Sequence, residues 1–143
     1  MTMRFLMAVV VGLCLALGVQ AGPMDAATPA RAAAGLAPIA DDAQLMRAAQ
    51  AQADHMARRG RIGHDGPGGS SVFDRVRATG FRGCFAAENV ATGQGDLGAV
   101  MRDWLGSSGH RRNILDRRAT HGAVAAARGG GTVYWAMVLA GRC

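Results

Sequence analysis

The stretch HGAVAAARGGGTVYWAMVLA, residues 121–140, decides the fold class of this chain. Two apolar runs, 121–127 and 132–140, lie on either side of the glycine-rich RGGG at 128–131. The second run contains valine, tyrosine and tryptophan, which suit a pleated surface, and glycines allow the backbone angles of a tight turn. The stretch therefore predicts two antiparallel strands joined by a short turn.

Three helices are predicted upstream of this hairpin. Each has apolar side chains at helical spacing and begins after a residue whose side chain can cap a helix. The first helix is capped by Asp41 or Asp42 and ends near Gly60. The second is capped by Ser70 or Ser71 and ends at Gly80. The third is capped by Asp96. Between the second and third helices, CFAAENVATG at 84–93 reads as a short strand ending in a turn. This order of elements predicts an α+β fold with a small antiparallel sheet covered by helices.

The first 21 residues have the pattern of a secretory signal peptide. One arginine and an apolar run precede Val19-Gln20-Ala21, whose small residues fit a signal-peptidase site. The run is short for a membrane span and a proline follows it soon after, although a retained anchor is the alternative. We therefore expect residues 1–21 to be removed. Residues 22–40 are then a flexible lead-in that belongs partly to the domain, and 41–143 are one domain with no membrane span.

Export is consistent with the cysteines and the charge. Cys84 and Cys143 remain after removal of the first 21 residues, and an even pair in an exported chain predicts a disulfide. Two unpaired thiols are the alternative.

The net charge is +6, but the arginines are scattered as single residues and doublets, which favours a solvated basic surface over nucleic-acid binding. We expect a secreted or periplasmic monomer.

Three residues are the main candidates for chemistry. Glu88 is the only glutamate and lies in an apolar segment, so a cation or a histidine is expected as its partner, because an unpaired buried carboxylate is costly. His64, in IGHDGPGG at 62–69, and His110, in a turn after the third helix, are the other candidates. Two imidazoles and a carboxylate with open positions would suit zinc or another divalent cation. The spacing alone does not bring the three together.

The chain also contains a series of short sequence motifs that occur together in a known family. They are LMRAAQAQADHMA (45–57), FDRVRATGF (73–81), ENVATG (88–93), MRDWLGSSGHRRNIL (101–115), HGAVAAA (121–127) and YWAMVLA (134–140). In sequence and order these motifs resemble those of the CAP superfamily, which comprises cysteine-rich secretory proteins, plant pathogenesis-related proteins, venom allergens and bacterial SCP-like extracellular relatives. The resemblance covers residues 31–140, and ENVATG with WLGSSGHRRNIL is typical of the bacterial branch.

The resemblance implies an α-β-α sandwich with a central cleft lined by two histidines and two glutamates. The histidines fall on His64 and His110, and the first glutamate falls on Glu88, which follows Ala87 where the family has glycine. The second glutamate falls on Ser107, so any mechanism that needs two carboxylates is in doubt. The implied ligand cleft consists of His64, Glu88, Ser107 and His110. Some family members bind zinc or similar ions through the two histidines, and others bind sterols or lipids in a separate groove.

Three functions remain open at this point. The first is a secreted binding module that holds a divalent metal, a small ligand or a cell-envelope fragment in the cleft. The second is a metal-dependent hydrolase of peptide or glycan, with Glu88 as the base that acts on a metal-bound water. The third is a structural or interaction protein, in which the same residues form a polar network that stabilises the fold. Arg75, expected to pair with a carboxylate or a helix end, and Asn113, expected to bridge backbone groups, are predicted to be architectural.

Overall fold

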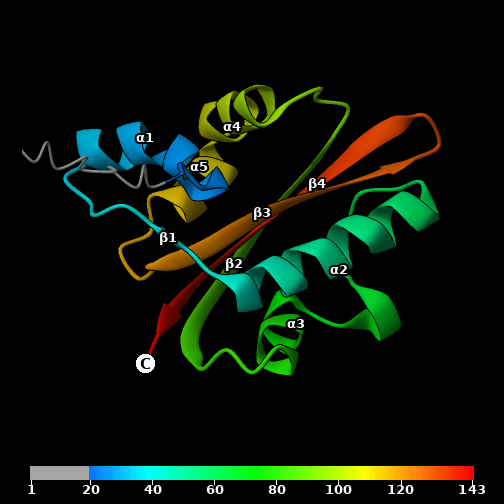
Figure 1. Cartoon of the computed structure of the whole chain (residues 1–143), viewed down its shortest axis with the longest axis horizontal. Coiled ribbons are helices and arrows are strands. Elements are labelled where there is room, and N and C mark those ends of the chain that lie inside the picture. Colours follow the sequence, from blue (N-terminus) through cyan, green and yellow to red (C-terminus); the bar gives the residue numbers. More distant parts are fainter. Residues whose placement is uncertain (1–19) are drawn as a thin grey trace, which may run out of the picture.

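The computed structural model describes residues 20–143 and shows a sheet between two helical layers (Figure 1). The helical elements on one face are η1 (Pro23–Ala27), α1 (Thr28–Ala33), α4 (Leu97–Gly106) and α5 (Ser108–Ile114). Those on the other face are α2 (Ala43–Arg59), η2 (Pro67–Gly69) and α3 (Val72–Ala78). The strands are β1 (Ala40–Asp41), β2 (Gly83–Thr92), β3 (His121–Gly129) and β4 (Thr132–Arg142). The predicted α+β sandwich is confirmed.

The sheet is built around the predicted hairpin. β3 and β4 pair antiparallel up to Gly129 and Thr132, and the two turn residues, Gly130 and Gly131, have φ angles of 57° and 80°. These positive angles are the ones that a two-residue type I′ turn requires. β2 pairs antiparallel with the other side of β4, which gives the strand order β1-β3-β4-β2. β1, which the sequence did not predict, adds a short parallel pairing to β3.

β4 is buried on both faces because each helical layer packs on one set of its alternating side chains. Tyr134, Ala136 and Val138 belong to the apolar cluster beneath α2 and α3. Met137 and Leu139 belong to the cluster beneath α4 and α5. Side chains alternate in the same way along β2, so consecutive residues of this edge strand point into different layers.

Residues 22–40 belong to the domain more fully than the sequence predicted. Met24 and Ala27 are completely buried in the cluster beneath α4 and α5. The guanidinium of Arg31 donates hydrogen bonds to four backbone carbonyl oxygens, those of Ala37, Ile114, Asp116 and Ala119, at 2.7–3.1 Å. This one side chain ties the N-terminal helices to the segment between α5 and β3, so the expected flexible lead-in is folded instead.

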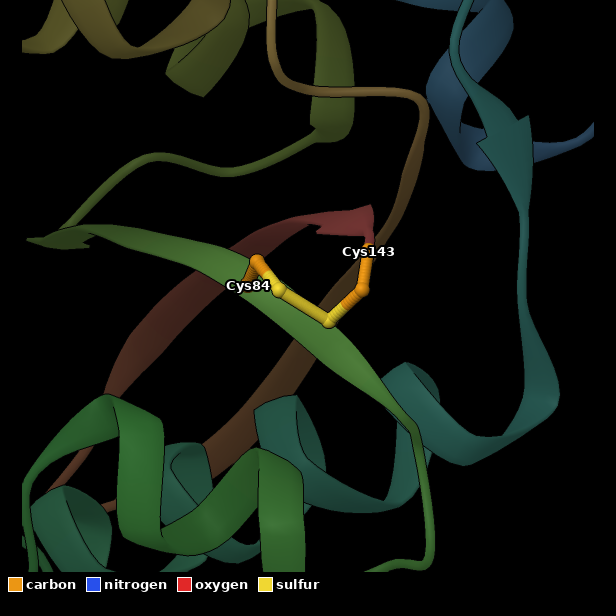
Figure 2. Close-up of a disulfide and its surroundings, with 2 residues drawn as sticks. All are labelled: Cys84 and Cys143. Atoms are coloured by element: carbon orange, nitrogen blue, oxygen red, sulfur yellow. A yellow bond between two sulfur atoms is a disulfide. The ribbon is translucent and has the colours of Figure 1, made fainter.

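The predicted disulfide is confirmed. Cys84, near the start of β2, bonds to Cys143, the last residue, over a sequence separation of 59 residues (Figure 2). It fastens the end of the central strand β4 to the edge strand β2. Within residues 20–143 no helix is both long enough and apolar enough to span a membrane. Most of the predicted signal peptide lies outside the described residues.

Candidate functional site

Glu88 is the centre of the candidate site and has the two kinds of partner that the sequence predicted. Its side chain, on β2, is only 2% exposed. Oε1 lies 2.9 Å from Nδ1 of His64, and Oε2 accepts a hydrogen bond of 2.5 Å from Nη2 of Arg75. The Arg75 side chain is itself 5% exposed, so the pair is a buried, charge-assisted contact. Both carboxylate oxygens are therefore engaged.

Arg75 also shapes the loop that carries His64. Nη1 of Arg75 donates to the carbonyl oxygen of Ser70 at 2.5 Å and to that of His64 at 3.2 Å. The loop passes so close to this guanidinium that a Cβ on Gly66 would lie 2.5 Å from Nη1. The predicted pairing of Arg75 with a carboxylate is thus confirmed, and the close approach of the guanidinium explains the glycine at position 66.

His64 is exposed, with 63% of its side chain in solvent. When Nδ1 carries the proton and donates to Glu88, the lone pair of Nε2 is free to accept a proton or bind a cation. Glu88 is therefore placed to fix the ring orientation and the tautomer of His64. The same arrangement is common for histidines that bind metals.

His110 is held by a neutral network on the opposite side of β2. Asn89, fully buried, donates from Nδ2 to the carbonyl oxygen of His110 at 3.1 Å. Asn113 donates to Oδ1 of Asn89 at 2.8 Å and to the carbonyl oxygen of Glu88 at 3.3 Å. The predicted bridging role of Asn113 is confirmed. Asn89 was missed, although it follows Glu88 directly in the sequence.

The two histidines are held from opposite sides of β2. Glu88 is opposite Val138, whose side chain packs beneath α2 and α3, and Asn89 is opposite Met137, which packs beneath α4 and α5. Burial lowers the pKa of His110, and the nearby imidazole of His64 lowers it further.

Ser107, the fourth residue of the expected cleft, lies at the junction of α4 and α5. Its backbone N–H donates to the carbonyl oxygen of Trp104, and its own carbonyl oxygen accepts from the N–H of Arg111. Within residues 20–143, no hydrogen bond joins the Ser107 side chain to His64, Glu88 or His110. The structure gives this residue a role in the helix junction.

Among the residues that the structure describes, the imidazoles of His64 and His110 are the only two groups of this site left as candidate ligands for a cation. Within residues 20–143 no group of three or more His, Cys, Asp or Glu side chains is placed to hold a metal ion. Glu88 is not available as a further ligand, because Arg75 and His64 occupy its oxygens. His64 and His110 would have to share such an ion with water or with a bound ligand.

A pocket of about 300 Å³ adjoins the loop of His64 and was not predicted. Its lining consists of His55, Met56, Arg59, Arg61, Ile62, Gly63 and Asp65. Neither Arg59 nor Arg61 forms an ion pair within the described residues. Nε2 of His55 is buried and has no hydrogen-bond partner there. His55 itself is half-buried in α2.

The model of the cysteine-rich secretory protein family, CAP, matches residues 24–139, which is most of the chain. The chain belongs to the CAP family. This CAP domain is 36% identical over 87 residues to the uncharacterized protein YkwD of Bacillus subtilis, a match of 61% of this chain and 34% of YkwD.

Solved structures agree on the fold of this CAP domain. An extracellular protein of Bacillus anthracis that contains an SCP domain superposes with a TM-score of 0.73 at 23% identity, over 84% of this chain and 39% of that one. An outer surface protein of Borrelia burgdorferi gives 0.75 at 16% identity, over 84% of this chain and 90% of that one. The chain thus spans about a third of YkwD and well under half of the Bacillus anthracis protein. At these identities the structural likeness shows the fold alone.

Proposed function

We propose that this CAP domain is an exported binding module that holds a small ligand or cell-envelope fragment between His64 and His110, with a divalent cation as a candidate bound species. The observation that carries the proposal is the placement of Glu88. Its buried carboxylate orients an exposed imidazole, and the charge of that ring contributes to the lowered pKa of the second imidazole, that of His110 on the other side of β2. A structural network would gain nothing from leaving His64 largely in solvent.

A divalent cation such as zinc would be held by Nε2 of His64 and by the ring of His110. The pKa of His110 is lowered, by burial first and by His64 second, which favours the neutral imidazole that metal binding requires. Glu88 would act through the opposite ring nitrogen of His64. When bound, the ion would supply a positive centre with open positions for the oxygen atoms of a ligand.

Hydrolysis with Glu88 as the base is less well supported by this geometry. A general base must be within hydrogen-bond reach of the proton that it removes. The Glu88 carboxylate is almost fully buried, and its oxygens are bonded to His64 and Arg75. We therefore assign Glu88 an orienting role, and His64 is the group that a ligand would meet.

The surroundings favour an anionic ligand outside the cytoplasm. Arg59 and Arg61 outnumber the single carboxylate of the adjoining pocket, that of Asp65, and form no ion pair among the described residues. The whole chain has a net charge of +6. The compared structures include an extracellular protein and an outer surface protein. Together with the predicted signal peptide, these features support a secreted or periplasmic location.

The test is calorimetric titration of Zn²⁺ into the metal-free domain and its variants. We expect saturable binding in the parent protein and its loss in both His64→Ala and His110→Ala. His121→Ala is the matched control, because His121 stacks edge-on against Phe81 at the start of β3 and is assigned no part in the cleft. Absence of binding at micromolar zinc, or equal binding in all three variants, would exclude the metal site.

A second measurement separates binding from hydrolysis. Peptide and glycan substrates are incubated with the zinc-loaded domain and with Glu88→Gln, after circular dichroism has shown that the variant is folded. No turnover is expected in either. Turnover that disappears in Glu88→Gln while zinc binding persists would support the hydrolase over the binding module.

A further inference from the structure

The backbone nitrogen of Gly22 lies among carboxylates. It donates a hydrogen bond of 2.9 Å to Oδ2 of Asp25, in η1. The carboxylate of Asp41, in β1, packs directly on the Gly22 backbone, since a Cβ added to Gly22 would overlap its Oδ2. Oδ1 of Asp41 accepts a further hydrogen bond from the N–H of Met24 at 3.2 Å. Two acidic side chains, those of Asp25 and Asp41, thus lie against Gly22, and there is no room for a side chain at this position.

In the intact chain this arrangement is electrostatically incomplete. Burial raises the pKa of Asp41, the hydrogen bond from Met24 opposes that change, and the neighbouring charge of Asp25 adds to it. The remaining acidic group of this corner, Asp42, caps α2 and lies 3.6 Å from the guanidinium of Arg142. Within the described residues, Asp25 and Asp41 have no such cation.

The fold also limits where the leader can be removed. Met24 is completely buried in the cluster beneath α4 and α5, so cleavage after Met24 would take a core side chain from the domain. The small residues that signal peptidases require at their site occur at Val19 and Ala21. The bond between Ala21 and Gly22 satisfies both conditions.

We propose that the chain is processed between Ala21 and Gly22, and that the new α-ammonium group of Gly22 forms an ion pair with Asp25 and Asp41. Water, activated by a signal peptidase, adds to the carbonyl carbon of Ala21 and the C–N bond to Gly22 breaks. The leader ends in the carboxylate of Ala21, and the nitrogen of Gly22 leaves as an amine that takes up a proton. A single amide donor is thereby replaced by a cation with three donors.

Processing would therefore complete the N-terminal corner of the domain. The precursor has two carboxylates at a neutral amide, and the processed chain has the compensating charge in the same place. This inference does not depend on the cleft, because Gly22, Asp25 and Asp41 touch none of the groups that orient His64 and His110.

The first measurement is the intact mass of the protein exported by a bacterial host that expresses the whole chain. We expect a product that begins at Gly22 and retains the disulfide. A product that begins at any other residue would overturn the proposal.

The ion pair is tested by comparing a chain that begins at Gly22 with one that keeps Gln20 and Ala21. We expect the extension to raise the unfolding equilibrium constant about three- to fivefold, as for a partly exposed ion pair. The effect should disappear in the Asp25→Asn/Asp41→Asn background. There, the amide oxygen that replaces Oδ1 of Asp41 can still accept the hydrogen bond from Met24.

Asp103→Asn is the matched control, because it removes one negative charge from α4, where Asp103 bonds to Gln94. The extension should raise the unfolding equilibrium constant by the same factor in Asp103→Asn as in the parent chain. An extension effect that is absent in the parent, or unchanged in the Asp25→Asn/Asp41→Asn background, would exclude the ion pair.

Discussion

Two networks start from neighbouring residues of one strand, yet they use different chemistry; we call them the ionic wall (Glu88, His64, Arg75) and the neutral wall (Asn89, Asn113, His110). On the α3 side, Glu88 holds His64 through a buried ionic network with Arg75. On the α5 side, Asn89 holds His110 through neutral amides and a backbone carbonyl. The ionic wall orients an exposed ring, whereas the neutral wall positions the backbone of a half-buried residue. A charge can steer the ring of His64, while His110 depends on where its helix is placed.

The ionic wall should be the more sensitive of the two to loss of a partner. Arg75→Met leaves the Glu88 carboxylate buried with only His64 as its partner, and we expect it to lower the free energy of unfolding by about 3–5 kcal/mol. Denaturation in urea measures this loss. In the double variant Arg75→Met/Glu88→Leu, no unpaired charge remains, so it should be more stable than Arg75→Met. A double variant that is less stable than the single one would contradict the ionic description.

Loss of an amide from the neutral wall should have a smaller effect. Asn89→Ala removes the donor to His110 and leaves the Asn113 amide without one acceptor, so a loss of about 1–3 kcal/mol is expected. Gln50→Ala is the matched control, because Gln50 lies on α2 and makes its hydrogen bonds near the surface, to Asp54 and Ala126. Equal losses in the two variants would show that the buried amide has no special role.

The walls should also differ in their response to acid. The pKa of His110 is lowered in the folded protein, by burial first and by His64 second, so the unfolded chain binds its proton more readily. The contribution of neutral His110 to stability should therefore be present above the ordinary value of 6.5 and decrease as the pH falls below it. Unfolding in urea at pH 7.5 and at pH 5, compared with His110→Gln, measures the difference.

His55 must be considered in that experiment. Burial lowers its pKa too, and the cations of Arg59, Arg58 and Arg75 lower it further, so it contributes acid sensitivity with the same sign. A His55→Gln control separates the two histidines. If His110→Gln leaves the loss of stability between pH 7.5 and pH 5 unchanged, His110 is not its source.

The smallest effect on stability is expected for His64→Ala. The ring is largely in solvent, so water can replace it beside Glu88, and a loss of less than about 1 kcal/mol is expected. Zinc titration of the same variant should nevertheless show complete loss of binding. A stability loss as large as that of Arg75→Met would instead assign His64 to the structural network.

The sequence predicts the features of this site that depend on local pattern. The hairpin follows from two apolar runs and three consecutive glycines. Partners for Glu88 are predictable because it is the only glutamate and lies in an apolar strand. Asn89, on β2, was missed because its partner is a backbone carbonyl of α5, that of His110, and no local sequence pattern indicates this contact. Its position beside Glu88 was the available signal, since consecutive strand residues face opposite layers.

The N-terminal helices show the same limit. Residues 22–40 are rich in alanine and proline without a clear period, so they read as a lead-in. Their order comes from Arg31, whose four carbonyl partners lie as far as 88 positions along the chain. β1 was likewise undetectable, because two residues carry no alternation and the pairing exists only where β3 is already present.

The position of β4 has a consequence for the order of events during biosynthesis. This strand follows all the other elements in the sequence and lies in the centre of the sheet, so β2 and β3 are joined only through it. A nascent chain whose β4 is still inside the ribosome can form helices but cannot close the sheet, and Cys84 cannot yet meet Cys143. The sheet therefore closes late, and the preceding polypeptide remains without its central strand until β4 has been synthesised.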